Sequence, residues 1–226
     1  MIHNELINRI LSSIILISLS IFFIIKGDLF FICFILVLLF ISIYEWYLMT
    51  KNTMYKLLGI IFLIISFYSS YLLRMEMDLD YIYFTLVLSI CILTDIGGYI
   101  FGKIIQGPKL TKISPKKTYA GAIGGYFCSI AIISLVFTYV DKISEVLNIN
   151  LLLKNFQFNI FIFIFLISTV SQFGDIFVSY FKRQSNIKNT GKIIPGHGGL
   201  LDRIDGMIFA YPIAYLITNT SIFKYL

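Results

Sequence analysis

Residues 179–205 read SYFKRQSNIKNTGKIIPGHGGLLDRID, and this stretch lies between two long apolar segments. It contains five Lys and Arg side chains, one His, two carboxylates and a glycine-rich turn. A chain whose neighbouring segments are almost wholly apolar does not need these polar groups to fold. They are the residue types that bind phosphate groups and metal ions in proteins. The stretch therefore predicts a site for a polyphosphate at a membrane surface.

The remainder of the chain is strongly apolar. Of the 226 residues, 58% are hydrophobic, 13% are charged and the mean hydropathy is +0.89. A soluble domain would carry about a quarter charged residues. Segments that cross a bilayer must be helices or closed barrels, and the long continuous apolar runs favour helices. We therefore predict an all-α, polytopic integral membrane protein.

The apolar runs predict about seven transmembrane helices, each near the ~20 residues that a bilayer requires. They cover residues 10–25, 29–49, 57–73, 81–102, 119–140, 158–181 and 204–223. An even number of spans is the alternative, if residues 143–155 lie in the membrane interface. We divide the chain into residues 1–78, with about three N-terminal spans, and residues 79–226, a catalytic membrane domain with about four.

Basic residues predict the orientation. In this arrangement of spans, thirteen of the eighteen Lys and Arg residues fall on one side of the membrane, and ten of them lie in the loops 103–118 and 182–203. Cytoplasmic loops carry the excess of Lys and Arg. The prediction is a multi-pass protein of the cell (inner) membrane with a cytoplasmic N-terminus and an active site facing the cytoplasm. Attraction to anionic lipid explains some of these charges, but it does not explain the Gly, Pro, Ser and His residues among them.

Two carboxylates lie inside predicted spans. Asp95 comes eight residues before Lys103, and Asp175 comes seven residues before Lys182. At ~1.5 Å per residue, both carboxylates lie about 10–12 Å below the cytoplasmic charges. A charge at such a depth costs several kcal/mol unless it is paired or faces a wet cavity. We therefore predict that Asp95 and Asp175 face one shared, water-filled pocket.

Two more carboxylates begin the last predicted span. Asp202 and Asp205 have i, i+3 spacing, which puts both on one helical face near a helix N-terminus. Acidic oxygens beneath a basic rim suit Mg²⁺ with a nucleotide, because Mg²⁺ takes few ligands from protein and the rest from water and phosphate. Asp95 and Asp175 have the alternative of pairing with a buried Lys or Arg, or of capping a helix kink near their glycines. Asp202 and Asp205 have the alternative of capping the helix and pairing with Arg203.

The two basic loops supply the candidate phosphate ligands. Residues 114–118 (SPKKT) directly precede a predicted helix, and hydroxyl and backbone N–H groups at a helix start bind anions. A Ser/Thr cap beside lysines is the alternative. In the second loop His197 lies among glycines, which favours a role in binding phosphate or relaying a proton over a packing role. The candidates in the two loops are Ser114, Lys116, Lys117, Thr118, Lys182, Arg183, Lys188, His197, Gly198, Gly199 and Arg203.

Two further features have local explanations. Trp46 is expected at the membrane interface, and Glu45 beside it is interpreted as a residue that snorkels or caps. Gly98 and Gly102 have the small-xxx-small spacing of packed membrane helices, and helix packing is the preferred interpretation.

With these motifs, the chain resembles the CDP-diglyceride synthetase (phosphatidate cytidylyltransferase) family. The resemblance covers residues 95–206, and the family signature has a Ser, a Lys-Arg pair, a Lys-Asp pair and a Pro-x-His-Gly-Gly…Asp-Arg-x-Asp end. The matching residues are Asp95, Tyr99, Gly102, Lys103, 114–118, Gln172, Gly174, Asp175, Ser179, Lys182, Arg183, Lys188, Pro195, His197, Gly198, Gly199, Asp202, Arg203 and Asp205. Asn189 departs from the pattern, because the family has Asp there. The chain is also short for the family, so we expect one or two N-terminal helices to be missing.

The resemblance implies that CTP and phosphatidate react to give CDP-diacylglycerol and pyrophosphate. It implies Mg²⁺ on Asp175, Asp202 and Asp205, with a second cation as an open alternative. The implied catalytic residues are Asp175, Asp202, Asp205, Lys182, Arg183 and His197. The implied substrate-binding residues are Ser114, Lys116, Lys117, Thr118, Lys188, Gly198, Gly199, Arg203 and Asp95. The expected partners are CTP, phosphatidate, the membrane and, as in the family, a second subunit in a homodimer, but no nucleic acid.

Three other functions stay open at this point. A CTP-dependent lipid kinase, such as a polyprenol kinase, has similar basic loops and would release CDP. A transporter of an anionic solute would be expected to show internal repeats with broken helices at the midplane, and the sequence shows no repeat. An inactive relative of the family is the third alternative, and it depends on Asn189 alone.

Overall fold

The computed structural model describes residues 15, 17–51, 53–75, 81–146, 157–194 and 198–219. A short apolar helix, Ile17–Lys26, comes first. The helices that follow are α2 (Asp28–Met49), α3 (Lys56–Met75), α4 (Ile82–Ile104), α5 (Tyr119–Val146), α6 (Gln157–Gln184), α7 (Leu201–Ile204) and α8 (Met207–Thr218). Within the described ranges, the backbone pairings of β type are two isolated bridges. The all-α prediction is confirmed.

Five of the described helices are long and apolar enough to cross a membrane. They are Asp28–Met49, Lys56–Met75, Ile82–Ile104, Tyr119–Val140 and Asn159–Gln184. These five coincide within a few residues with the predicted spans from 29–49 to 158–181, so the chain is a multi-pass membrane protein. The two outer predicted spans correspond to Ile17–Lys26 and Met207–Thr218, which are shorter than the ~20 residues of a full span. The predicted number of seven is therefore not confirmed by the described residues.

The last predicted helix, 204–223, is wrong as one continuous element. Helix α7 begins earlier, at Leu201, and a turn at Asp205 and Gly206 separates it from α8. The Asp205 carboxylate accepts the Gly206 N–H at 3.0 Å, so this donor is bonded to a side chain. Such local bonds compete with the helical ladder. Pro212 lies inside α8, where it removes a further ladder donor.

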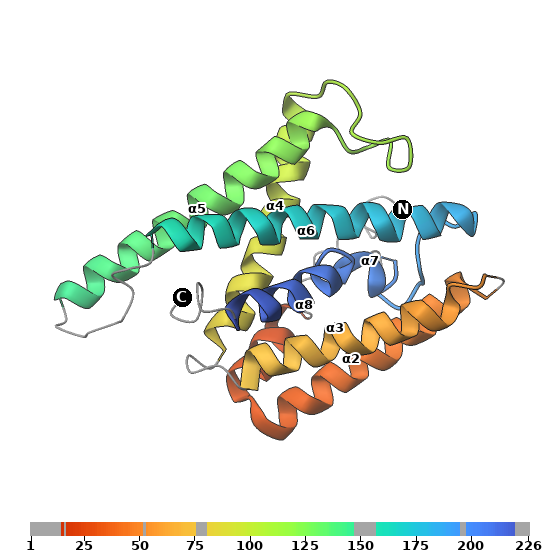
Figure 1. Ribbon diagram of the computed structural model, residues 1–226, viewed down its shortest axis with the longest axis horizontal. Coiled ribbons are helices and arrows are strands. Elements are labelled where there is room, and N and C mark those ends of the chain that lie inside the picture. The colour runs from red at the N-terminus through yellow and green to blue at the C-terminus, as the bar shows by residue number, and fades with distance from the viewer. Residues whose placement is uncertain are drawn as a thin grey trace.

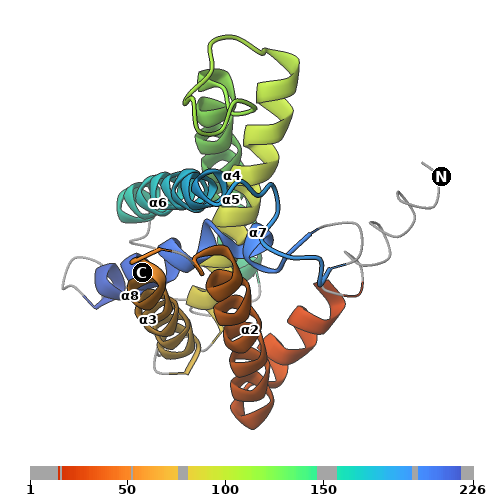
Figure 2. The ribbon, with the colours of Figure 1, turned by 90° about the vertical axis from the view of Figure 1, so that its right-hand side faces the viewer.

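The helices form two pairs with a central layer between them. Figure 1 shows α6 and α8 crossing the molecule between α5 and the α2–α3 pair, and Figure 2 shows α5 above and α2 and α3 below, with α4 running from the α5 side past this layer. The packing agrees, since α6 contacts α4, α5 and α8, and α8 also contacts α3. Three of the candidate site residues, Asp175, Lys182 and Arg183, lie on α6 in this layer.

Glycines allow α4 and α5 to pack closely. A Cβ on Gly121 would lie 2.7 Å from the Gly98 carbonyl oxygen and 3.3 Å from the Gly102 Cα. A Cβ on Gly97 would collide with α5 at the Gly124 carbonyl oxygen. The packing interpretation of the Gly98–Gly102 spacing is therefore confirmed. The close contact fixes where the loop between the two helices begins and ends.

Three polar connections lie at the same end of the bundle. They join α2 to α3, α4 to α5 and α6 to α7, and all three are on the right-hand side of Figure 1. Ser185, just after α6, donates a hydrogen bond to the Met49 carbonyl at the end of α2, at 2.5 Å. Arg183 donates to the carbonyl of Ile113 in the α4–α5 loop, at 3.5 Å. Both basic loops thus meet at the C-terminal end of α6.

Candidate active site

Two glycines bring the start of α8 against α6. A Cβ on Gly174 would lie 2.8 Å from the Asp205 carbonyl oxygen and 2.6 Å from the Phe209 ring. A Cβ on Gly206 would collide with the hydroxyl of Ser171. Since only glycine fits at these two contacts, the close approach is built into the sequence. It sets the Asp205 carboxylate beside the segment of α6 that carries Asp175.

Asp95, Asp175 and Asp205 form an acidic cluster. The charge of Asp175 acts directly on both Asp95 and Asp205, which come from α4 and from the turn before α8. Lys117 forms an ion pair with Asp175 and offsets part of this repulsion. The three carboxylates therefore lie within electrostatic range of one another, whereas the water-filled pocket stays a prediction. The alternative of an Asp175–Lys pair also holds, and the two interpretations are compatible.

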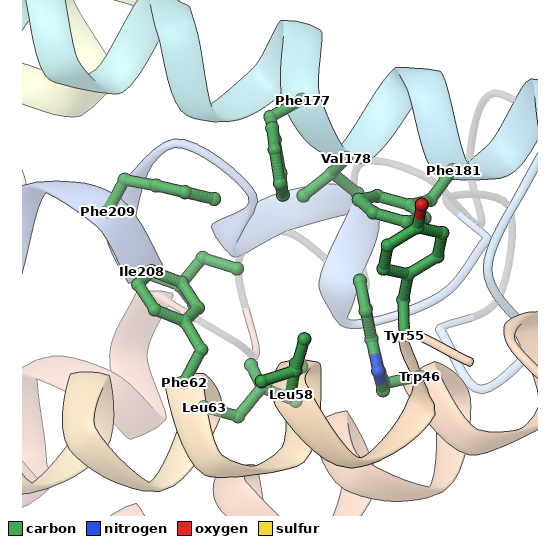
Figure 3. A pocket seen from close by; sticks show the side chains of 11 residues that line it. Trp46, Tyr55, Leu58, Phe62, Leu63, Phe177, Val178, Phe181, Ile208 and Phe209 are labelled. Carbon is green, nitrogen blue, oxygen red and sulfur yellow. The ribbon is translucent and has the colours of Figure 1, made fainter. Parts of the chain in front are cut away.

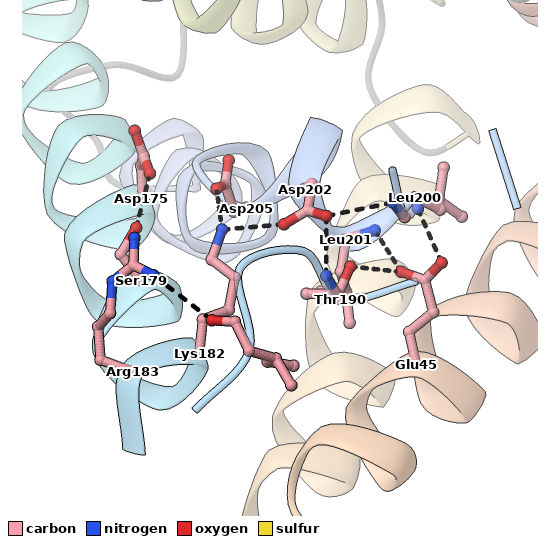
Figure 4. A network of polar contacts seen from close by, with 12 residues as sticks. Glu45, Asp175, Ser179, Lys182, Arg183, Thr190, Leu200, Leu201, Asp202 and Asp205 are labelled. Atoms are coloured by element: carbon pink, nitrogen blue, oxygen red, sulfur yellow. Dashed lines mark hydrogen bonds and ion pairs between the residues drawn. The ribbon is translucent and has the colours of Figure 1, made fainter. Parts of the chain in front are cut away.

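Lys182 lies between the other two predicted carboxylates. Its Nζ is 2.9 Å from Asp202 Oδ1 and 4.0 Å from Asp205 Oδ2, and its side chain is 10% exposed. Figure 4 shows the ammonium group reaching from α6 toward both acids. The i, i+3 spacing of Asp202 and Asp205 has placed them on one face, as expected, although the helix is interrupted between them. One buried cation thus connects the acidic cluster to Asp202.

Asp202 also organises the loop that precedes it. Its Oδ2 accepts the backbone N–H of Thr190 at 2.8 Å and that of Gly199 at 3.1 Å. Together with Lys182, these contacts engage both carboxylate oxygens. Asp202 therefore holds the two ends of the glycine-rich segment together, in addition to carrying charge into the site.

Glu45 is the residue that the sequence interpretation missed. This carboxylate on α2 is fully buried, and it accepts hydrogen bonds from the Thr190 hydroxyl at 2.8 Å and from the backbone N–H groups of Leu200 and Leu201, each at 2.9 Å. It caps α7, a helix about 155 positions further along the chain. The snorkelling interpretation is therefore wrong, whereas the capping interpretation is confirmed, with a helix that is distant in sequence. The sequence carried one signal for this buried role, because Glu45 lies only one turn before the end of an apolar helix.

Glycines around Glu45 leave room for its carboxylate. A Cβ on Gly191 would lie 2.5 Å from Glu45 Oε1, and one on Gly199 would lie 2.5 Å from Glu45 Oε2 and collide with the Thr190 hydroxyl. Gly199 was predicted to let the backbone approach a ligand closely. The group that approaches the backbone is the protein's own carboxylate.

The first basic loop has a compact turn before α5. Thr118 caps α5, because its hydroxyl accepts the Gly121 N–H at 3.1 Å, and Ser114 accepts the Lys117 N–H through its carbonyl at 3.0 Å. The capping alternative for Thr118 is therefore what the structure shows. Lys117 points to Asp175, whereas Lys116 is exposed. The loop places one lysine in the acidic cluster and leaves a second at its rim.

The remaining candidates lie around this core. Lys188 and Arg203 are exposed, and the charge of Arg203 acts on Asp95. Gly198 has a φ of +93° and pairs with Ile194 through two backbone hydrogen bonds of 2.9 and 3.2 Å, which close the glycine-rich turn. His197 lies outside the described residues.

The donor set fits a divalent cation such as Mg²⁺ that takes few protein ligands. In the part of the chain that the structure describes, no point is surrounded by three or more acidic, His or Cys side chains. Asp175 and Asp205 supply hard carboxylate oxygens within electrostatic range of one another, and each lies beside a lysine ammonium group. Mg²⁺ commonly binds one or two protein carboxylates and completes its shell with water and substrate phosphate.

Comparisons with known proteins agree with this arrangement. The model of the Cytidylyltransferase family matches residues 54–221. A phosphatidate cytidylyltransferase of Rickettsia bellii is 38% identical over 96% of this chain and 92% of its own length, and one of Rickettsia felis is 36% identical over 93% and 91%. One of Staphylococcus aureus is 38% identical over 57% of this chain and 46% of its own length. The chain belongs to the cytidylyltransferase family.

Proposed function

We propose that this protein is a phosphatidate cytidylyltransferase, which converts CTP and phosphatidate to CDP-diacylglycerol and pyrophosphate. The observation that carries the proposal is the interleaving of two lysines with four carboxylates where α4, α6 and α7 meet. Lys117 pairs with Asp175 and Lys182 with Asp202, inside a bundle of membrane-spanning helices. The relatives with this name match along nearly the whole chain. A lipid phosphate and a nucleoside triphosphate are both anionic, so a site that binds them together requires such cationic groups.

The reaction is an in-line displacement at phosphorus. An oxygen of the lipid phosphate forms a bond to the α-phosphorus of CTP, the bond from that phosphorus to the bridging oxygen breaks, and pyrophosphate leaves with the electron pair. Such transfers depend on positioning and on neutralising charge more than on covalent help from the protein. The attacking phosphate is already an anion above its second pKa near 6, so the step does not require a general base.

The cations of the site have separate tasks in this proposal. Lys117 and Lys182 enter the acidic cluster and neutralise phosphate charge when substrates displace the carboxylates from them. Arg183 and Lys188 lie exposed at the end of α6 and in the loop after it, where they receive the outer phosphates of CTP. Lys binds phosphate as a mobile point charge, whereas Arg offers a planar fork. The exposed Arg183 and Lys188 thus suit the outer phosphates of CTP, and Lys117 and Lys182 suit the phosphate groups that react.

Mg²⁺ completes the proposal. Asp175 and Asp205 would hold the ion, and Asp202 would reach it only after releasing Lys182, because both oxygens of Asp202 are engaged. When bound, the ion would polarise the phosphate oxygens and stabilise the charge that develops on pyrophosphate. Ser114, Thr118, Gly198 and Gly199 would contribute by shaping the two loops.

The basic end of the bundle faces the cytoplasm in this proposal. The three polar connections at that end, together with the helix residues beside them, carry twelve of the eighteen Lys and Arg residues, and cytoplasmic loops have this excess. CTP would then enter from the cytosol while the acyl chains of phosphatidate stay in the bilayer. The homodimer that the resemblance implies stays a prediction.

Purified protein with CTP, phosphatidate and Mg²⁺ tests the proposal. We expect pyrophosphate in equal amount to CDP-diacylglycerol, with the label of α-labelled CTP in the lipid. Transfer of the γ-label to a lipid alcohol, with release of CDP, would identify a lipid kinase. Uptake of an anion into liposomes without a lipid product would identify a transporter. Asp175→Asn serves as the inactive control.

A further inference from the structure

An apolar cavity of about 240 Å³ lies between α3, α6 and α8, next to the charged site. Figure 3 shows its walls, which are aromatic or aliphatic on every side. The lining residues are Trp46, Tyr55, Leu58, Gly59, Phe62, Leu63, Phe177, Val178, Phe181, Ile208 and Phe209. No charged side chain of the described residues contributes to this lining.

The cavity has a buried floor and an open mouth. Trp46, Leu63 and Val178 are buried, whereas the side chains at the mouth are exposed, with 65% for Leu58 and 39% for Phe177. These mouth residues lie on α3 and α6, which are long and apolar enough to cross a membrane. An exposed apolar mouth on such helices is suited to open toward lipid.

The floor is built around one tryptophan. A Cβ on Gly59 would collide with the indole of Trp46, so glycine on α3 makes the room in which the ring lies. The indole N–H donates to the Lys56 carbonyl at 3.2 Å, and the ring meets Phe181 edge-on with centroids 5.0 Å apart. This anchoring holds the ring in place, which gives the cavity a defined shape.

The cavity and the charged site share the same turns of α6 and α8. On α6, Phe177 and Val178 lie between Asp175 and Lys182 in sequence. On α8, Ile208 lies one helical turn after Asp205. Charged groups for a phosphate and an apolar space therefore lie about one turn apart, which is the layout of a phosphate group esterified to a hydrocarbon chain.

We propose that this cavity binds one acyl chain of the phosphatidate substrate. The proposal rests on the proposed function and adds a subsite to it. Bilayer lipid is as apolar as the cavity, so burial from water does not drive this binding. The gain is positional, because a held chain orients the phosphate relative to CTP. A second copy of this chain fits the space less well, since a stable protein interface buries about 800 Å² on each partner, far more than this cavity offers.

Quenching of Trp46 fluorescence tests the occupant directly. Trp46 is the single tryptophan of the chain, so all indole emission reports from the cavity floor. We expect phosphatidate with brominated acyl chains to quench this emission at low mole fraction and to saturate, and unlabelled dioleoyl phosphatidate to reverse the effect. Brominated phosphatidylcholine at the same mole fraction should quench much less. Equal quenching by both lipids, or no quenching by either, would overturn the proposal.

A pair of neighbouring substitutions tests the role in turnover. Leu58→Trp fills the mouth, whereas Leu57→Trp adds the same ring at a position that is 67% exposed and outside the lining. We expect Leu58→Trp to raise the KM for dioleoyl phosphatidate about tenfold, the effect of a misfit in an apolar pocket. The KM for CTP and the turnover of dihexanoyl phosphatidate should stay near those of the unsubstituted protein, as should all values for Leu57→Trp. An equal loss with long and short chains would mean that Leu58 is structural and would overturn the proposal.

The two readouts separate this inference from the proposed function. Saturable quenching by phosphatidate without any turnover would leave the cavity assignment standing and remove the cytidylyltransferase proposal. Turnover with neither quenching nor an effect of Leu58→Trp would leave the enzyme assignment standing and remove the acyl-chain site.

Discussion

The carboxylate of Glu45 accepts a hydrogen bond of 2.8 Å from the hydroxyl of Thr190, a residue 145 positions away. The same carboxylate accepts the first backbone N–H groups of α7, so it sets the entry to the helix that carries Asp202. Asp202 in turn holds Thr190 and Gly199. Two carboxylates therefore clamp the glycine-rich loop from opposite sides, and one of them comes from the N-terminal part of the chain.

The first prediction concerns this clamp. Glu45→Ala leaves buried donors without acceptors, and each unsatisfied group costs about 1–3 kcal/mol. We expect the midpoint of thermal unfolding in detergent to fall by several degrees, and CTP turnover to fall at least about tenfold, which corresponds to ~1.4 kcal/mol. Glu45→Gln keeps an acceptor oxygen and should lose less. Lys51→Ala, at an exposed position just after α2, is the control. Full activity of Glu45→Ala would show that the loop keeps its shape without the clamp.

The second prediction concerns the pairing of Lys117 with Asp175. Asp175→Asn should abolish turnover while the protein still inserts in the membrane, because a proposed metal ligand is lost. Lys117→Met removes the cation from the acidic cluster, and we expect it to lower turnover and to change its dependence on Mg²⁺ concentration. Lys112→Met, at an exposed position in the same loop, should leave both near those of the unsubstituted protein. If Lys117→Met behaves like Lys112→Met, Lys117 has no part in the reaction.

The third prediction uses two glycines that differ in the space around them. Gly199→Ala would push a methyl group against the Thr190 hydroxyl and to 2.5 Å from Glu45 Oε2, whereas Gly98→Ala would meet its nearest atom at 3.6 Å. We expect Gly199→Ala to disrupt the loop and lose turnover, and Gly98→Ala to keep both activity and the unfolding midpoint. Limited proteolysis would show whether cleavage in the loop rises in Gly199→Ala. Unchanged turnover in that variant would show that the loop relaxes without cost.

Much of the fold follows from hydropathy alone. Five predicted spans match α2 to α6, because a bilayer requires apolar runs of defined length and each run here is continuous. The interruption at Asp205 was not predictable in this way. It depends on a hydrogen bond from the Gly206 N–H to the Asp205 side chain and on close contact with α6, and neither feature changes the hydropathy pattern of the sequence.

The sequence predicted which residues belong to the site better than it predicted the contacts between them. Asp175, Lys182 and Asp202 stood out because charge is costly near apolar spans, and the structure brings them into one region. The sequence did not say which lysine meets which acid, because such pairs join distant segments. The partners of Glu45 were not predictable for the same reason, since they lie on and after a loop that the helix pattern does not place.

The fourth prediction concerns Asn189, where the family has Asp. A Cβ on Gly198 would lie 3.2 Å from the Asn189 side-chain carbon Cγ and 3.1 Å from Asp202 Oδ2, so Asn189 lies close to the clamped carboxylate. If Asp175 and Asp205 hold the metal, a new carboxylate at position 189 adds no ligand that the ion requires. We therefore expect Asn189→Asp to keep CTP turnover within a few-fold.

Titration of turnover with Mg²⁺ checks this point. Loss or gain of a group close to a metal changes affinity by about 10–100-fold, so the half-maximal Mg²⁺ concentration is a sensitive measure. An unchanged value in Asn189→Asp agrees with an ion between α6 and the start of α8. A fall of about tenfold or more would place the ion beside Asp202 and residue 189, because only there does the added charge reach it. In that case Asp202 would exchange Lys182 for the metal, and Asn189 would explain a weaker affinity for the ion in this chain.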